Sequence, residues 1–271
     1  MRLLILLVLV ACHGAPPRYA GGLLAPIDIR GDRLLVRAMI DGKPRVMVLD
    51  TGASITSIST ATARDLGIHA ESTMEINDHI PAGLGTIKSL SIGLAVHANV
   101  RVAIVDLPNA RDSAIQFDGI LGLDVLSQHD IALDFRHRTL VMYPRGAIVE
   151  HALMPWMSTV ALQGNSRGLM LLSVTIGDHP PIPAMLDLGA PITVINPAAA
   201  KLLGVTQPLF RVPSMTVGKV ELARRTMMVR DLGVFQRAGL GDRPAILLGS
   251  DVFAKRSLVI SYRDRVAMVS R

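Results

Sequence analysis

The sequence predicts a mainly β protein of two similar lobes, and three observations lead to this fold class. Residues 47–58 resemble residues 184–195, so a segment of the chain occurs twice. Asp41-Gly42 stands between two short aliphatic runs, which is the strongest short-range signal for a β-hairpin, and Gly177-Asp178 has the same place in the second half. Runs rich in Val, Ile and Leu dominate both halves, which favours strands over long helices.

The internal repeat extends over most of the chain. Six of the nine positions from Asp50 to Ile58 are identical to those from Asp187 to Ile195. Further matches follow in the same order: residues 91–93 with 216–218, 102–107 with 227–232, 120–126 with 247–253, and 134–136 with 261–263. An ordered series of this kind indicates a duplication. We therefore predict an N-terminal lobe over residues 27–145 and a C-terminal lobe over residues 155–271.

The elements of the two lobes are predicted in pairs. Asp50 and Asp187 each follow an apolar strand and lie two residues before a glycine, so both are expected in turns. Gly67 and Gly204 are expected to end short helices. The expected helices are residues 61–66 and 198–203, and the expected strands before the turns are residues 34–40, 45–49, 171–176 and 182–186.

Composition and charge exclude several classes of protein. The 271 residues carry 28 Lys+Arg and 22 Asp+Glu, a net charge of +6, without a block of five or more basic residues, so nucleic-acid binding is not expected. The single cysteine excludes a disulfide framework and a cysteine-rich metal site. No apolar stretch reaches the roughly 18 residues of a membrane-spanning helix.

The N-terminus is interpreted as an export signal. Residues 3–11 form an unbroken apolar run behind Arg2, which is typical of the centre of a signal peptide. The run ends in Leu9-Val10-Ala11-Cys12, which resembles the bacterial lipoprotein box, in which the cysteine is acylated. We expect a signal peptide over residues 1–11, a lipid anchor on Cys12, a tether over residues 12–26, and a location in the bacterial cell envelope, facing the periplasm or the cell surface. The alternative is an ordinary signal peptide with a chance cysteine.

The motif Asp50-Thr51-Gly52-Ala53, preceded by apolar residues, resembles the active-site loop of aspartic proteases, particularly the retroviral-type (retropepsin-like) group. Residues 120–126 resemble the same group's segment of two apolar residues and a glycine, which packs across the aspartate loop in that family. The second copies, Asp187-Leu188-Gly189-Ala190 and residues 247–253, are altered but in register. The resemblance covers residues 34–269, once per half, and implies two acid-protease-like β-barrel lobes with a cleft between them.

The resemblance implies that Asp50 and Asp187 form a catalytic pair. Peptide hydrolysis by this route uses two carboxylates, one from each lobe, which hold one water between them. Because like charges so close together cannot both ionise, the pair shares a proton, and one member is the base while the other binds the scissile carbonyl. A retroviral-type chain supplies one aspartate and must dimerise, whereas this chain supplies both, as pepsin does.

Several neighbours are expected to support the two aspartates. Gly52 and Gly189 let the backbone approach the carboxylates and donate N–H groups to them. In the family, the hydroxyl of the residue at Thr51 reaches across to the opposite loop, and Leu188 lacks this hydroxyl in the second copy. The complete set of predicted loop-support residues is Thr51, Gly52, Ala53, Gly189, Ala190, Gly122 and Gly249.

The first half also has room for a flap. The stretch from Asp50 to Gly93 spans 43 residues, against 31 from Asp187 to Gly218. The longer stretch contains Gly83-Leu84-Gly85, and the resemblance implies a β-hairpin with glycines at its tip that folds over the substrate. The alternative is a plain surface loop.

The sequence therefore predicts a monomeric, lipid-anchored aspartic endopeptidase that binds an extended peptide or protein substrate. No metal or organic cofactor is implied, because the nucleophile is water. The neighbouring residues His129, Asp130, Asp134 and His137 are interpreted as a solvated turn between strands. Two alternatives stay open. One is a catalytically weakened or inactive peptide-binding lipoprotein of the same fold, with Leu188 as the sign of decay. The other is a homodimeric retropepsin-type enzyme that uses Asp50 from each chain.

Overall fold

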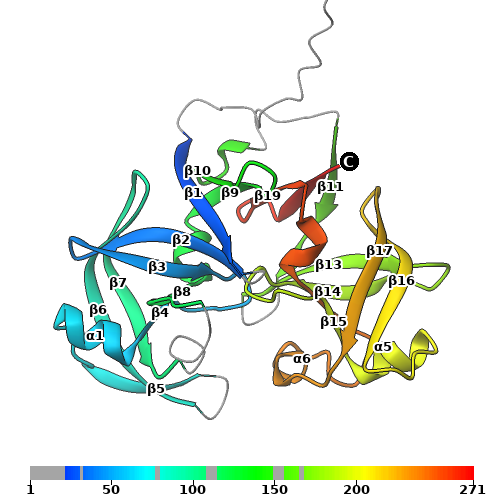
Figure 1. Cartoon of the computed structure of the whole chain (residues 1–271), viewed down its shortest axis with the longest axis horizontal. Helices are drawn as coiled ribbons and strands as arrows, with labels where there is room; N and C mark the ends of the chain where they lie inside the picture. Colours follow the sequence, from blue (N-terminus) through cyan, green and yellow to red (C-terminus); the bar gives the residue numbers. More distant parts are fainter. Residues whose placement is uncertain (1–21, 31–32, 77–79, 108–114, 149–155, 165–167) are drawn as a thin grey trace, which may run out of the picture.

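The computed structural model describes residues 22–30, 33–76, 80–107, 115–148, 156–164 and 168–271 (Figure 1). The predicted signal peptide and Cys12 lie outside these ranges. Strands dominate the described residues and form two barrels, so the predicted fold class is confirmed. Within the described ranges, no helix has the length and apolarity needed to cross a membrane.

The first lobe is a closed barrel of six strands. Its strands are β2 (Arg33–Ile40), β3 (Lys43–Leu49), β4 (Ser57–Ser59), β6 (Ile80–Ile92), β7 (Ala95–Val105) and β8 (Gly119–Leu121). They are hydrogen-bonded in the order β2-β3-β8-β4-β7-β6, and the pairing of β2 with β6 closes the ring. At the edge, β5 (Ser72–Ile76) pairs with β6, and α1 (Thr60–Leu66) follows β4.

The second lobe repeats this arrangement. Its strands are β13 (Met170–Ile176), β14 (Ile182–Leu186), β15 (Val194–Ile195), β16 (Leu209–Val217), β17 (Val220–Val229) and β18 (Ile246–Leu248). Their order is β13-β14-β18-β15-β17-β16, closed by the pairing of β13 with β16, and β12 (Gln163–Gly164) pairs with the outer edge of β13. Two helices complete the lobe, α5 (Pro197–Leu202) and α6 (Gly233–Arg237).

A third group of strands joins the two lobes. These strands are β1 (Leu23–Arg30), β9 (His129–Asp134), β10 (Thr139–Pro144), β11 (Met157–Ala161), β19 (Ser257–Ser261) and β20 (Val266–Ser270). They form one sheet in the order β11-β20-β19-β9-β10-β1, which lies between and above the barrels in Figure 1. In its middle, β19 from the second half pairs antiparallel with β9 from the first, with Ile260 opposite Ile131. The predicted boundary near residues 145–155 therefore falls between strands of a single shared sheet.

Local sequence signals explain the turns and helix ends. Asp41 and Gly42 connect β2 and β3 with positive φ angles of 48° and 80°, so the predicted hairpin is confirmed. Both predicted helices form, and the first ends at Gly67, whose φ of 67° is the left-handed conformation that glycine adopts without strain.

Two expectations from the sequence are wrong. Residues 23–26, predicted as the end of the tether, form the first half of β1, because Ala25 and Ile27 on one face of the strand are buried in the core. The predicted solvated turn begins with β9, in which Asp130 and Asp134 are buried, and only the residues after Asp134 turn. The carboxylate of Asp134 organises that turn by accepting hydrogen bonds from the backbone of Arg136 and His137.

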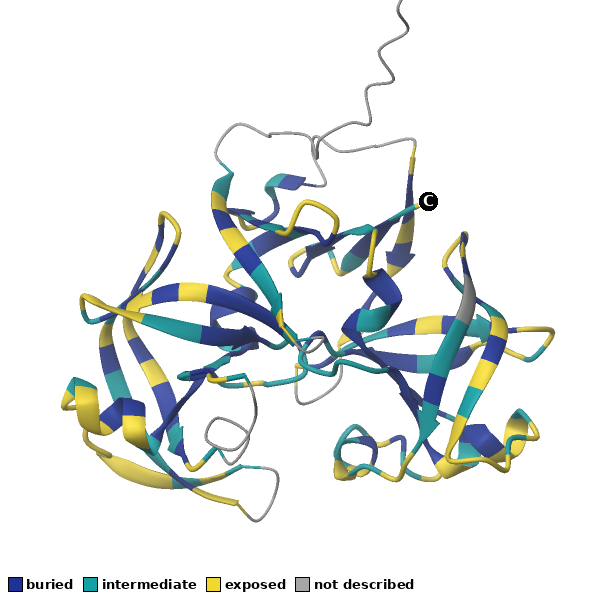
Figure 2. Cartoon of the chain, in the orientation of Figure 1, coloured by how far each residue is buried: buried dark blue, intermediate teal, exposed yellow. Residues whose placement is uncertain are grey.

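The hydrophobic core is continuous through the molecule. One cluster of buried side chains, almost all of them aliphatic, runs from the first barrel through the shared sheet into the second barrel. Figure 2 shows buried and exposed residues alternating along the barrel strands, as expected when one face of each strand points inward. Because the barrels and the shared sheet pack on one core, the loops between the lobes have fixed positions relative to one another.

Candidate active site

The Asp50 loop begins where β3 leaves the first barrel. The backbone N–H of Asp50 donates to the carbonyl of Leu121 in β8 (3.1 Å), which fixes the start of the loop. The Oδ1 atom of Asp50 then accepts hydrogen bonds from the N–H groups of Gly52 (2.7 Å) and Ala53 (3.1 Å). The carboxyl group is therefore oriented by the backbone of its own turn.

The Asp187 loop has the same construction at the end of β14. Its N–H donates to the carbonyl of Leu248 in β18 (3.0 Å). Its Oδ1 atom accepts hydrogen bonds from the N–H groups of Gly189 (2.9 Å) and Ala190 (3.1 Å). Gly189 and Ala190 therefore orient the carboxyl group of Asp187 in the same way as Gly52 and Ala53 orient that of Asp50.

The two loops meet between the lobes and bring Asp50 and Asp187 together. The two carboxyl groups lie close enough for each to shift the pKa of the other. A Cβ atom added to Gly52 would lie 2.6 Å from the Cγ atom of Asp187, and one added to Gly189 would overlap the carboxyl group of Asp50. Only glycine fits at these two positions, because each carboxyl group packs directly on the backbone of the opposite loop.

Burial and proximity change the protonation of the pair. Burial raises the pKa of Asp50, while the N–H groups of Gly52 and Ala53, the bond to Asp187 and the positive charge of Arg33 oppose the rise. Burial, followed by the negative charge of Asp50, raises the pKa of Asp187 well above its ordinary value. The pair therefore shares one proton, and the positive charge of Arg33 favours the ionised form on the Asp50 side.

A second layer of hydrogen bonds supports each loop from behind. Asp124, in α3 (Leu123–Leu126), accepts bonds at one oxygen from the hydroxyl (2.7 Å) and the N–H (2.9 Å) of Thr56. The same hydroxyl accepts a bond from the N–H of Gly122 (3.1 Å). This places Gly122 against the loop, as predicted. A Cβ atom there would lie 2.7 Å from the carbonyl carbon of Ile55.

The second lobe repeats this support in η1 (Ser250–Phe253). The hydroxyl of Thr193 donates to Asp251 (2.9 Å) and accepts from the N–H of Gly249 (3.1 Å), the other predicted glycine. Burial raises the pKa of both Asp124 and Asp251. Sequence reasoning missed these Thr–Asp pairs as parts of the site, although both residues of each pair are identical in the two repeats, which is a signal that would have found them.

A comparison with protein families agrees with this geometry. Residues 36–125 match the sequence model of the aspartyl protease family. The matched segment includes most of the first barrel, the Asp50 loop and Gly122. Over this segment, the first lobe is therefore similar to the aspartyl protease family. No curated protein matches the chain.

The two loops of this site differ at Thr51 and Leu188. The buried hydroxyl of Thr51 donates to the carbonyl of Leu186 (2.9 Å) and accepts from the N–H of Leu188 (3.0 Å), so it joins the first loop to the second. Leu188 is fully buried at the corresponding position and carries no hydroxyl that reaches back. The side-chain brace between the loops is therefore one-sided.

The predicted flap residues have a different place from the one expected. Gly83, Leu84 and Gly85 lie within β6, paired with β5 on one side and β7 on the other, rather than at a hairpin tip. A Cβ atom on Gly83 would lie 2.8 Å from the Cβ atom of Ala70, and one on Gly85 would lie 2.9 Å from the carbonyl of His69. These glycines therefore allow the chain between α1 and β5 to pack closely on β6. The turn between β5 and β6, residues 77–79, lies outside the described residues.

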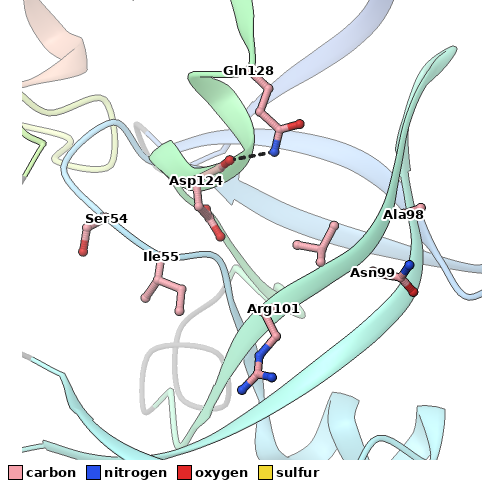
Figure 3. Close-up of a pocket in the computed structure, with 8 residues that line it drawn as sticks. Ser54, Ile55, Ala98, Asn99, Arg101, Asp124 and Gln128 are labelled. Carbon is pink, nitrogen blue, oxygen red and sulfur yellow. Dashed lines mark hydrogen bonds between the residues drawn. The ribbon is translucent and has the colours of Figure 1, made fainter.

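A pocket of about 360 Å³ opens on the first lobe beside the Asp50 loop (Figure 3). Its walls are Ser54 and Ile55 of the loop, residues 98–101 of β7, and Asp124 and Gln128. In Figure 3 the side chain of Gln128 reaches back to the backbone carbonyl of Asp124, to which it donates a hydrogen bond of 2.9 Å. Asp124, which supports the Asp50 loop from behind, is thus accessible to solvent through this pocket.

The Thr51 brace yields a stability prediction. Thr51→Val keeps the shape of the side chain but leaves the carbonyl of Leu186 and the N–H of Leu188 buried without the hydroxyl, which should lower the free energy of unfolding by about 1–3 kcal/mol. Urea unfolding of the purified protein measures the change. Thr73→Val on the exposed face of β5 is the matched control and should change stability by less than about 0.5 kcal/mol. Equal stability of wild type and Thr51→Val would show that the brace contributes nothing.

Proposed function

We propose that this protein is an aspartic endopeptidase in which Asp50 and Asp187 activate one water molecule. The observation that carries the proposal is the pair of buried, adjacent carboxyl groups, each held by two N–H groups of its own turn. The family match of the first lobe supports the same chemistry. Since the nucleophile is water, the proposed reaction needs neither a metal nor an organic cofactor.

Each carboxyl group has a distinct role in the proposed reaction. Asp50, the ionised member, takes a proton from the water as its oxygen attacks the carbonyl carbon of the peptide bond. Asp187, which holds the shared proton, donates a hydrogen bond to the carbonyl oxygen as negative charge develops there. The departing amine then takes a proton from the pair as the tetrahedral intermediate breaks down, which returns one carboxylate and one carboxylic acid.

Two observations favour this proposal over its alternatives. The place beside Asp50 that the aspartate of a second chain would need is filled by Asp187 and the backbone of Gly189, which favours a monomer over a retropepsin-type dimer. Leu188 leaves both N–H bonds to Asp187 in place, which favours an active enzyme over an inactive binding protein. The equal strand orders and paired hydrogen bonds of the two lobes support a duplication as the origin of the site.

The proposed substrate is an extended segment of a peptide or protein. Hydrolysis by two carboxyl groups that lie between two lobes requires the scissile bond to lie against both loops. An extended peptide can take this position while its backbone forms hydrogen bonds with neighbouring strands. Nothing in the proposed chemistry involves nucleic acid.

The proposal predicts that both aspartates are essential. Asp50→Asn and Asp187→Asn should each reduce kcat for cleavage of an unfolded protein substrate by at least about 10²–10⁴-fold, because each removes a proton-transfer group. Fragment analysis by mass spectrometry follows the cleavage, with Asp178→Asn in an exposed turn as the matched control that keeps activity. Full activity in Asp187→Asn would contradict the single-chain pair. Absence of cleavage by the wild type from acid to neutral pH would favour the binding role.

The raised pKa of Asp187 also predicts how stability depends on pH. A carboxyl group whose pKa is higher in the folded than in the unfolded state stabilises the fold below the unfolded value, and this contribution is lost as the pH rises through the folded value. The side chain of the Asp187→Asn variant stays neutral at every pH. The variant should therefore gain stability relative to wild type as the pH rises from the ordinary pKa of an aspartate to 7. Urea unfolding at several pH values tests this, with Asp178→Asn as control. A constant difference in stability across that range would contradict the prediction.

We further propose that the enzyme is exported and anchored in the bacterial cell envelope by lipid on Cys12. The sequence around this only cysteine supports the proposal, because it has the form of a lipoprotein box behind an apolar signal. In a bacterial host fed an alkyne-labelled fatty acid, the wild type should carry the label and sediment with membranes, whereas Cys12→Ser should carry none. Label on Cys12→Ser, or none on the wild type, would refute the anchor.

A further inference from the structure

His97 and His129 face each other on the first lobe, away from the aspartate loops. His97 belongs to β7 and is buried, and His129 begins β9 and is half-buried. Their Nε2 atoms are 3.3 Å apart, and their rings meet edge to face with centroids 5.0 Å apart. The contact joins the barrel to the shared sheet.

The surroundings fix which nitrogen of each ring carries hydrogen. The Nδ1 atom of His129 lies 3.3 Å from the backbone carbonyl of Tyr143, which can only accept, so this Nδ1 must be the donor. The Nδ1 atom of His97 lies 3.2 Å from Oε1 of Gln128. That assignment of the amide is fixed in turn, because its nitrogen donates to the backbone carbonyl of Asp124 (Figure 3).

Both rings in their neutral form therefore carry hydrogen on Nδ1 and a lone pair on Nε2. Two lone pairs that face each other at 3.3 Å repel, so the arrangement is stable only with a cation between or beside them. A neutral ring could avoid this repulsion by carrying its hydrogen on Nε2 instead. Its Nδ1 atom would then face a carbonyl or amide oxygen, and neither atom would have a hydrogen to donate. The geometry thus calls for a cation at the two Nε2 atoms.

We propose that His97 and His129 bind one divalent transition-metal ion, such as Zn²⁺, through their Nε2 atoms. Two nitrogen ligands about 2.0–2.1 Å from a tetrahedral zinc ion are about 3.3–3.4 Å apart, which is the separation found here. Hydrogen bonds from Nδ1 to carbonyl oxygens are also the usual way in which metal-binding histidines are oriented.

Other features of the site agree with a metal rather than a shared proton. Burial, followed by the neighbouring His97, lowers the pKa of His129, so this ring is neutral near pH 7 and has its lone pair available. The charge of the buried Asp130 opposes this lowering and would favour either cation at the site. No cluster of three or more His, Cys, Asp or Glu side chains forms a metal site among the described residues, so water would fill the remaining positions, which the partial exposure of His129 permits.

The proposed ion has a structural role that is independent of the proposed protease activity. It would link β7 to the start of β9, and Gln128 connects His97 to Asp124, the residue that supports the Asp50 loop. Binding should therefore stabilise the first lobe and leave the chemistry of the aspartates to the loops.

The test is a titration of purified, metal-free wild-type protein with Zn²⁺ at pH 7.5. Calorimetry should give one ion per chain, and ¹⁵N NMR of the imidazole rings should show both Nε2 signals of His97 and His129 moving with that stoichiometry. The melting temperature should rise by roughly 5–10 °C when free Zn²⁺ is about 100 times its Kd. His97→Gln and His129→Gln should lose this rise, whereas His69→Gln, a change to an exposed histidine, should keep it.

The NMR titration decides the matter even where a variant fails to fold. Nε2 signals of His97 and His129 that ignore Zn²⁺ and respond only to pH would show a shared proton and overturn the proposal. Zinc bound elsewhere, with an unchanged rise in melting temperature in both His97→Gln and His129→Gln, would overturn it as well.

Discussion

The structure depends on holding two carboxyl groups together against their mutual repulsion. Asp50 and Asp187 lie in buried surroundings, where two full negative charges side by side would repel strongly, so the pair keeps one proton and a hydrogen bond in place of the second charge. Neither loop can relieve the contact by retreating. Each carboxyl group is bonded to its own backbone, and each loop packs on the glycine of the other.

The loops hold their positions against this repulsion because a second set of hydrogen bonds supports each of them from behind. Behind each aspartate lies a Thr–Asp pair, Thr56 with Asp124 and Thr193 with Asp251. Each pair ties the loop to the short helix that follows β8 or β18, the strand paired with the one that precedes the loop. Those helices lead directly into β9 and β19, the two strands that pair at the centre of the shared sheet. The register between β9 and β19 therefore sets how the two loops meet.

The sequence predicts the parts of this arrangement that are local or repeated. The repeat locates both aspartates and the glycines that touch them, and turn residues such as Asp41-Gly42 locate a hairpin, because each rests on short-range geometry. The shared sheet is beyond such reasoning, since β9 and β19 are more than a hundred residues apart and either strand's pattern fits many partners. The prediction for Gly83 and Gly85 is wrong for a related reason, because a glycine in a sequence indicates a turn and a close approach of two segments equally well. Only the packing of Ala70 and His69 against these glycines shows that they allow a close approach.

A single chain can make its two aspartates unequal, which a dimer of identical halves cannot do by sequence. Arg33, at the start of β2, places positive charge near Asp50, whereas the corresponding end of β13 carries the apolar residues Leu169 and Met170. The Thr51 brace likewise belongs to one loop only. The charge of Arg33 lowers the pKa of Asp50 and has no counterpart among the causes that shift the pKa of Asp187, so the two carboxyl groups are unequal before any substrate arrives. Leu188 leaves both N–H bonds to Asp187 in place, so under the proposed function its departure from the Thr51 pattern does not require loss of activity.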